Sequence, residues 1–237
     1  MKKILRYALI VIVLFTISFI FYSAFVIISS RISTPGIISK YHETHKTDLR
    51  SNDLSEWQTR ALIMVEDPNF FKHSGVDFST PGAGITTISQ GLVKILYFND
   101  FSPGLAKLKQ TLIARFTFDP LISKDEQLSM FINMAYLGNM DGKYIFGFTN
   151  AAKLYYKKQF KKLNKDEYLS LIAMLIAPDN FNLISRPKAN KERVRRIKLL
   201  ISGKYHPKGL MDLYYGPLDE DSRKGLPPAS YYPELYK

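Results

Sequence analysis

The 237-residue sequence contains no cysteine, so the fold is built without disulfide bonds. This absence fits a domain outside the cytoplasm, but it decides nothing alone. The sequence also lacks internal repeats, low-complexity runs and any convincing succession of alternating strands. From Leu54 to about Ser202 the patterning is mostly helical, and an apolar content of 46% can bury the core of one ordinary domain. We therefore expect a mainly α fold.

One long stretch near the N-terminus lacks charged residues. The residues Tyr7–Ser29 are almost wholly apolar, and a helix of about 20 such residues spans the core of a bilayer. Lys2, Lys3 and Arg6 precede this stretch, so the positive-inside rule places the N-terminus in the cytoplasm and everything after Arg31 outside. A cleaved signal peptide is the alternative, although the stretch is longer than a usual signal core and no clear small-x-small cleavage site follows it.

Composition divides the chain into four parts. Residues 1–30 form the predicted membrane anchor, and the mostly polar residues 31–53 form a connector lying near the membrane. Residues 54–202 form the helical domain. Residues 203–237 are rich in tyrosine and proline and are expected to be irregular structure laid over that domain.

Acidic residues are too few to balance the basic ones. The chain has 33 Lys and Arg against 21 Asp and Glu, a formal charge of +12. Nucleic acid is the generic partner for such a balance, but the anchor argues against it. Anionic lipid headgroups and diphosphate-bearing lipids are better matched to a basic domain tethered outside a membrane. The alternative is a lysine excess on a solvated surface.

The densest group of ionisable side chains lies between residues 65 and 77, directly after a helical apolar pattern. Ser55–Gln58 has the spacing of a capping box, and Pro68 disfavours further helix, so Glu66 falls in the last helical turn. There, unpaired carbonyls and burial by the phenylalanines that follow would raise the pKa of Glu66 towards that of a general base. The alternative is a solvated acid that ends a helix.

A second block runs from Gly84 to Lys94 and predicts a helix that begins with a capping box of Thr87 and Gln90. A helix N-terminus with free amide donors, hydroxyl groups and a lysine further along can bind a diphosphate. The alternative is an amphipathic helix with a good cap and a solvated lysine. Capping boxes at Ser123–Glu126 and Asn164–Glu167 predict two further helix starts.

A third helical pattern follows the second block. Its apolar stripe consists of Leu105, Leu108, Leu112 and Phe116. The other side of this predicted helix carries Lys107, Gln110, Thr111 and Ala114.

These blocks resemble the signatures of the peptidoglycan glycosyltransferases, which are the monofunctional cell-wall transglycosylases and the N-terminal domains of bifunctional penicillin-binding proteins. The first signature, Glu-Asp-x-x-Phe-x-x-His-x-Gly, is met by Glu66, Asp67, Phe70, His73 and Gly75. The second, Gly-Gly-Ser-Thr-Ile-Thr-Gln-Gln-Leu followed by a small residue and Lys-Asn, is matched by Gly84, Thr86, Thr87, Ile88, Ser89, Gln90, Leu92 and Lys94. The resemblance runs in order from about Leu54 to Leu200 and implies a lysozyme-like, two-lobed helical domain.

The sequence departs from the family in two ways around the second signature. Gly91 and Ile95 replace its second Gln and its Asn. The segment between Asp77 and Gly84 is also shorter than the mobile segment that family members usually carry there. We therefore expect a shortened flap over the cleft.

The third signature, Arg-Lys-x-x-Glu, lacks its acid here. Alignment forward from Lys94 puts Lys107 on the family's Lys and Gln110 on its Glu, whereas alignment backward from residues 123–126 puts Thr111 there. Neither alignment offers a carboxylate. A Gln can hydrogen-bond a sugar or phosphate oxygen, but it cannot carry charge or shuttle a proton.

The resemblance implies a mechanism. Glu66 would deprotonate the 4-hydroxyl of the acceptor's N-acetylglucosamine, which attacks the donor's N-acetylmuramic acid at the anomeric carbon with inversion and expels undecaprenyl diphosphate. Lys94 and Lys107 would hold the leaving diphosphate, and Gln110 stands in the place of the second catalytic acid. The other residues implied at the substrate are Asp67, His73, Thr86, Thr87 and Gln90, of which Asp67 and His73 shape the site rather than react.

The resemblance also implies the surroundings of the protein. Its partners would be an undecaprenyl-diphosphate-linked substrate, the membrane, and transpeptidases or other cell-wall enzymes, with no nucleic acid. It would be a single-pass protein of the bacterial cytoplasmic membrane with its catalytic domain outside. The resemblance implies no particular cofactor, and a divalent cation is left open.

Two other functions remain open. A degenerate glycosyltransferase would bind the precursor or cell-wall enzymes without turnover, which would account for the missing acid and the short flap together. A hydrolase of the lysozyme type would use a single Glu as its acid, and the ordered signatures disfavour it.

Overall fold

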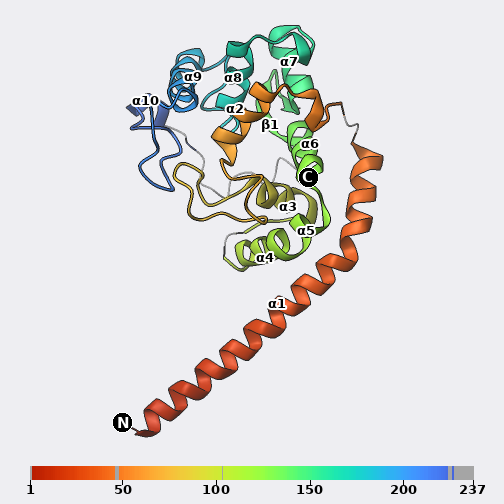
Figure 1. The fold of residues 1–237 in the computed structure, drawn as a ribbon, viewed down its shortest axis with the longest axis vertical. Coiled ribbons are helices and arrows are strands. Elements are labelled where there is room, and N and C mark those ends of the chain that lie inside the picture. The colour runs from red at the N-terminus through yellow and green to blue at the C-terminus, as the bar shows by residue number, and fades with distance from the viewer. Residues whose placement is uncertain (1, 46–47, 103, 224–225, 227–237) are drawn as a thin grey trace.

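The computed structural model describes residues 2–45, 48–102, 104–223 and 226, and it is mainly α-helical, as the sequence predicts (Figure 1). The α-helices are α1 (Lys2–Thr44), α2 (Glu56–Glu66), α3 (Ile88–Tyr97), α4 (Leu105–Ile113), α5 (Asp119–Leu121), α6 (Lys124–Met134), α7 (Phe148–Tyr156), α8 (Lys165–Met174), α9 (Pro187–Ile201) and α10 (Glu220–Arg223). Shorter turns are the 3-10 helices η1 (Ser51–Asp53) and η3 (Phe160–Lys162) and the π-helical turn η2 (Ala114–Phe118).

A small antiparallel hairpin was not expected from the sequence. It pairs β1 (Tyr136–Met140) with β2 (Lys143–Phe146). The two turn residues, Asp141 and Gly142, both have positive φ angles of 53° and 77°, which an Asp-Gly pair adopts readily in a two-residue hairpin turn. The strands are short, so their alternation is too weak to stand out among helical patterns.

The helix α1 extends far beyond the domain at its N-terminal end (Figure 1). It has 43 residues, which gives a length of about 65 Å at 1.5 Å per residue, roughly twice the thickness of a bilayer core. The helix is long and apolar enough to cross a membrane, a test that a signal sequence near the N-terminus also passes. The side of the membrane on which the domain lies therefore stays a prediction.

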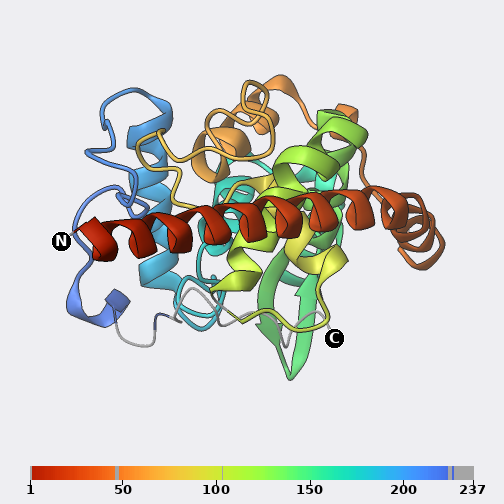
Figure 2. The ribbon, with the colours of Figure 1, turned by 90° about the horizontal axis from the view of Figure 1, so that it is seen from below.

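The C-terminal half of α1 packs on α4 and η2, and Figure 1 shows it running along one side of the domain. Figure 2 shows the same helix from below, in front of the domain. Three polar contacts hold it there: Ser30 Oγ to Thr117 Oγ1 at 2.7 Å, Arg31 Nη2 to Phe116 O at 2.8 Å, and Thr34 Oγ1 to Tyr97 Oη at 2.7 Å. These contacts make the stem of the predicted anchor part of the folded domain.

The connector predicted over residues 31–53 is helical as far as Thr44, and the division of the chain into parts stays a prediction. Pro35 lies inside the helix, where it removes one backbone hydrogen bond. The hydroxyl groups of Ser33 and Thr34 donate to Ser30 O in the preceding helical turn, so these side chains do not draw the backbone out of the helix. Packing of α1 against the domain outweighs the local signals that disfavour helix near Pro35. Helix propensity alone does not include this packing.

Most predicted helix starts are confirmed. Reciprocal capping boxes form at Ser55 with Gln58, Thr87 with Gln90, and Asn164 with Glu167. At Ser123 only half of the predicted box forms, because Ser123 Oγ accepts from Glu126 N while the Glu126 carboxylate lies 3.2 Å from His42 Nε2 on α1.

The predicted apolar stripe of the third helical pattern is wrong at both ends. Leu105 is 75% exposed and Phe116 is 47% exposed, whereas Gln110 and Ala114, expected on the opposite side, are buried. For Phe116 the reason is the turn from Ala114 to Phe118, which is π-helical and adds a residue to the turn. Phe116 is thereby rotated away from the stripe that a regular α-helix would continue.

The tail is irregular from residue 203 to 219, as expected, and it is laid over the domain by the contacts described below. Residues 224–225 and 227–237 lie outside the described residues, so the prediction for them is not tested.

Candidate active site

Glu66 is the last residue of α2, as the sequence predicts. Its backbone is fixed at the helix end because Asp67 N still donates to Ile63 O at 2.9 Å and Pro68 follows. Burial raises the pKa of Glu66 to about 7, while Arg193 acts in the opposite direction and Asp67 adds to the rise. A carboxyl group that ionises near neutral pH is well suited to accept a proton as a general base.

Asp67 connects the loop after α2 to the start of α3. Its carboxylate is 1% exposed and accepts hydrogen bonds from His73 Nε2 at 2.9 Å and from Ile88 N at 3.0 Å. His73 Nδ1 is buried and has no hydrogen-bond partner among the described residues. Asp67 and His73 thus form a buried pair beside Glu66, which agrees with a role in shaping the site.

Gly75 allows the loop to approach the turn η2 closely. Its φ angle is +81°, and a Cβ atom built on it would lie 2.3 Å from Ala114 O. Its own carbonyl oxygen accepts a hydrogen bond from Thr87 Oγ1 at 2.7 Å. Any side chain at this position would push the loop, and with it the α3 N-terminus, away from η2.

We expect Gly75→Ala to lower the free energy of unfolding by about 2 to 4 kcal/mol, because it combines a strained φ angle with a backbone clash. Gly142→Ala is the matched control: Gly142 also has a positive φ angle, of +77°, but a Cβ there would meet nothing within 4 Å. Thermal unfolding of both variants in detergent measures the difference. Equal losses in the two variants would show that the approach to Ala114 is not tight.

The side chains of Thr87 and Gln90 are engaged within the protein. Thr87 N donates to Gln90 Oε1 at 3.1 Å, and Gln90 Nε2 donates to Thr111 Oγ1 at 3.1 Å. Both residues are buried. These hydrogen bonds fix the N-terminus of α3. Contact of Thr87 and Gln90 with substrate stays a prediction.

Lys94 and Lys107 come close enough to affect each other, although they lie on α3 and α4. Lys107 Nζ donates to Ile85 O at 3.1 Å and to the exposed Thr86 Oγ1 at 2.9 Å. Burial and the charge of Lys94 lower the pKa of Lys107 to about 8. Burial also lowers the pKa of Lys94, whose Nζ lies 5.1 Å from the Phe101 ring centre. Two half-buried cations without a carboxylate partner among the described residues favour an anionic ligand.

Among the described residues no group of three or more His, Asp or Glu side chains could hold a metal ion.

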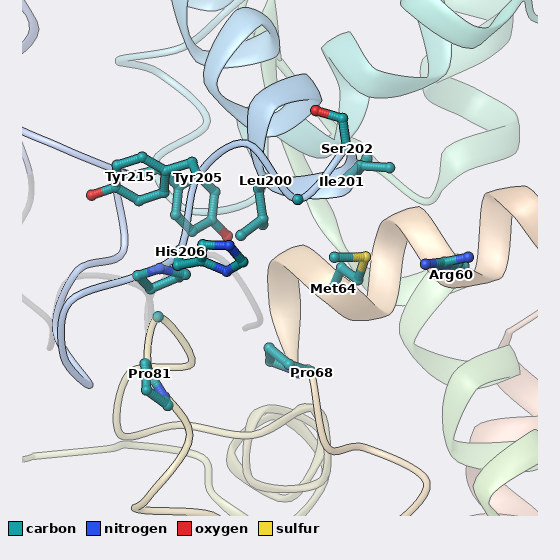
Figure 3. Close-up of a pocket in the computed structure, with 13 residues that line it drawn as sticks. Arg60, Met64, Pro68, Pro81, Leu200, Ile201, Ser202, Tyr205, His206 and Tyr215 are labelled. Carbon is teal, nitrogen blue, oxygen red and sulfur yellow. The ribbon is translucent and has the colours of Figure 1, made fainter.

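A pocket of 390 Å³ lies on another side of α2 (Figure 3). Arg60, Met64 and Pro68 line it together with Tyr205, His206 and Tyr215 from the chain after α9. None of the predicted site residues lines this pocket, although its lining residues Pro68 and Tyr215 adjoin the end of α2.

Comparison with known proteins shows to which family this sequence belongs. The sequence pattern of the family described as transglycosylase matches residues 35–201. The chain belongs to the transglycosylase family.

Its relatives are penicillin-binding proteins. The chain is 29% identical over 169 residues to penicillin-binding protein 1F of Bacillus subtilis, an alignment that covers 66% of this chain and 23% of the relative. It is 28% identical over 174 residues to penicillin-binding protein 1A of Neisseria gonorrhoeae, covering 68% and 21%. Penicillin-binding protein 1A of Pseudomonas aeruginosa is 28% identical over 170 residues, covering 66% and 20%. The transglycosylase chain thus spans less than a quarter of the length of these relatives.

Gln110 and Thr111, the two candidates for the family's second acid position, both make hydrogen bonds within the protein. Gln110 is 1% exposed, and its Nε2 donates to Gln90 O at 2.6 Å while its Oε1 is buried without a partner among the described residues. Thr111 Oγ1 donates to Lys107 O at 2.8 Å. Gln110 therefore ties α4 to α3, and the choice between Gln110 and Thr111 as the family's acid position stays open.

Two residues near Glu66 in the transglycosylase were not identified from the sequence. Arg193 on α9 is 3% exposed, and Tyr215 in the tail is 4% exposed. The buried face of α9 also contains Asn190, Ile197 and Leu200, and Arg193 follows their helical spacing. That periodicity could have separated Arg193 from the exposed Arg195 beside it, but nothing local indicates that Tyr215 returns to α2.

Proposed function

We propose that this protein is a membrane-anchored peptidoglycan glycosyltransferase that polymerises a lipid-linked disaccharide-peptide into glycan strands. The observation that carries the proposal is the way one short segment joins the two halves of the site. Asp67, directly after Glu66, accepts a hydrogen bond from Ile88 N. Lys107 Nζ donates to Ile85 O and Thr86 Oγ1, which lie three and two residues before Ile88. The segment of the proposed base and Lys107 of the proposed anion-binding pair are thereby both hydrogen-bonded to residues 85–88.

In the proposed reaction, the Glu66 carboxylate takes the proton from the acceptor's 4-hydroxyl group. The oxygen forms a bond to the donor's anomeric carbon from the face opposite the leaving group, so the configuration inverts. The bond from that carbon to the diphosphate oxygen breaks, and the diphosphate lipid leaves with the bonding electrons. Lys94 and Lys107 stabilise the negative charge that develops on it, and they do so in a half-buried position where charge interactions are stronger than in water.

The proposal includes the organisation of the chain. Residues 1–30 would be the anchor, 31–53 the stem, 54–202 the catalytic part and 203–237 a tail. The domain would lie outside the cytoplasmic membrane, and α1 packing on α4 and η2 would keep the site at the depth of a lipid-linked donor. Thr86, Thr87, Gln90 and the Asp67–His73 pair would complete the substrate site, and transpeptidases would be the proposed partners.

The test is polymerisation of labelled lipid-linked disaccharide-pentapeptide by the detergent-solubilised protein, measured between pH 5.5 and 9. Glu66 must be ionised to act as a base, so kcat/KM should rise through its pKa of about 7. Lys107 must be protonated to hold the diphosphate, so kcat/KM should fall again above about pH 8. Polymer formation that stays constant from pH 5.5 to 9 would contradict both assignments.

A second candidate function is binding of the precursor without turnover. It is favoured by Gln110, one of the two residues that alignment puts on the family's Glu, because its amide is tied to Gln90 O. Saturable binding of the labelled precursor with no polymer at any pH would support this function and reject the first. Shorter glycan products from preformed strands would instead indicate a hydrolase.

A further inference from the structure

The chain after α9 forms a braced loop, residues 204–217, which we call the C-terminal loop. Asp212 holds it together by accepting hydrogen bonds from Tyr205 Oη at 2.6 Å, Lys208 N at 3.0 Å and Gly216 N at 3.0 Å. Arg196 on α9 donates to the carbonyls of Tyr214, Gly216 and Pro217. This loop is therefore an ordered part of the domain, although its sequence has no regular pattern.

The C-terminal loop also binds the segment that precedes α3. Gly82 N donates to Gly209 O and Gly84 N donates to Leu210 O, both at 2.9 Å. A Cβ atom on Gly84 would lie 3.0 Å from the Leu213 side chain. The loop thus lies directly against the segment that leads to Thr86 and the α3 N-terminus.

The same loop holds Arg193 in a buried position. Arg193 Nη1 donates to Leu213 O at 3.1 Å. Its guanidinium lies 5.4 Å from the ring centre of Phe181, 5.6 Å from that of Tyr214 and 5.3 Å from that of Tyr215. Its Nε is buried without a hydrogen-bond partner, and the guanidinium forms no salt bridge among the described residues. A buried charge of this kind is costly unless another charge compensates it.

Arg193 interacts electrostatically with Glu66 at the end of α2. Tyr215, which lies on the Arg193 guanidinium, donates its hydroxyl to Val65 O at 3.2 Å, one residue before Glu66. The helices α2 and α9 are in contact. The charged and titratable groups that act on Glu66 are Arg193, Asp67 and the Tyr215 phenol. Burial raises the pKa of Tyr215 to about 12, so the phenol is neutral near pH 7, and Arg193 is the cation of the set.

We propose that Arg193 is a positioning residue for the general base: clamped by the C-terminal loop, its guanidinium faces the end of α2 and favours the carboxylate form of Glu66. The proposal rests on the function proposed above and adds a part of the site outside the signature blocks. Burial and Asp67 both disfavour ionisation of Glu66, and Arg193 opposes them. Without Arg193 the base would stay protonated over more of the neutral pH range.

The test is a direct titration of Glu66 that does not depend on catalysis. The full chain, labelled with carbon-13 at the glutamate carboxyl groups, is titrated by NMR in detergent micelles, with Glu66→Gln used to assign the signal. We expect Arg193→Met to raise the midpoint of Glu66 by about one pH unit. In Arg193→Lys, which keeps the charge, the midpoint of Glu66 should stay much nearer to that of the parent.

Two further variants complete the test. Arg195→Met is the matched control, because Arg195 is an exposed neighbour on α9 paired with Glu192, and it should leave the midpoint unchanged. If Arg193→Met does not fold, Arg193→Gln decides the question, since Gln can still donate to Leu213 O but has no charge. An unchanged Glu66 midpoint in a folded, uncharged Arg193 variant would overturn the proposal.

The result can be separated from the fate of the proposed function. If the protein polymerises its substrate, the acid limb of kcat/KM should move upward in Arg193→Gln by the same amount as the NMR midpoint. If the parent makes no polymer, the glycosyltransferase proposal fails while the titration still reports whether Arg193 controls Glu66.

Discussion

Glu66→Gln is expected to slow polymerisation by about 10³-fold, within the range that general acid–base catalysis contributes. Gln has nearly the shape of Glu, so it can remain at the end of α2, but it cannot accept the proton of the acceptor hydroxyl. The loss should appear in kcat more than in KM, because the proton is transferred only in the reacting complex. Product formation from labelled lipid-linked disaccharide-pentapeptide at pH 7.5 measures it.

The stability of the same variant distinguishes a lost base from a damaged fold. The folded-state pKa of Glu66 is raised from 4.5 to about 7, so folding favours its protonated form and ionisation destabilises the protein as the pH rises from about 4.5 to 7. At pH 8 a neutral Gln should therefore leave the melting temperature equal or higher. Glu56→Gln, at the exposed first turn of α2, is the matched control and should retain nearly full activity. A Glu66→Gln variant that is inactive but also unfolded would contradict this account of Glu66.

The local parts of the site could be predicted because their signals are short in sequence. The start of α2 at Ser55, its end at Glu66 and the start of α3 at Thr87 each depend on residues within four positions of one another. The pairing of Lys94 with Lys107 came only from the resemblance to a family. Hydrophobic spacing alone would have left both lysines on solvated faces.

The parts that were wrong or missed depend on contacts between distant segments. The helix α1 continues through Pro35 because it packs on α4 and η2, more than 60 residues later in the chain. Phe116 leaves its predicted stripe because η2 is π-helical. Tyr215 reaches the end of α2 across 150 residues. No pattern within a single helix contains this information, whereas the helical spacing of the buried residues of α9 does include Arg193.

The second large effect is expected for Lys107→Met, which should lower kcat/KM by about 10²-fold. The ammonium group lies on Thr86 Oγ1 and Ile85 O without a carboxylate partner among the described residues, and its pKa is already lowered to about 8. An anion bound beside it would favour the charged form of Lys107, and the departing diphosphate carries more negative charge in the transition state than in the bound substrate. Most of the loss should therefore fall on kcat.

Lys109→Met is the matched control for this effect. Lys109 is on the same helix, and its Nζ lies 5.2 Å from the ring centre of Phe98 rather than beside Thr86. Removing Lys109 takes away the same charge from the protein. A general loss of attraction to an anionic lipid would therefore lower kcat/KM equally in both variants. A fall confined to Lys107→Met would locate the diphosphate at the Lys94 and Lys107 pair, whereas a loss of less than about twofold would remove Lys107 from the mechanism.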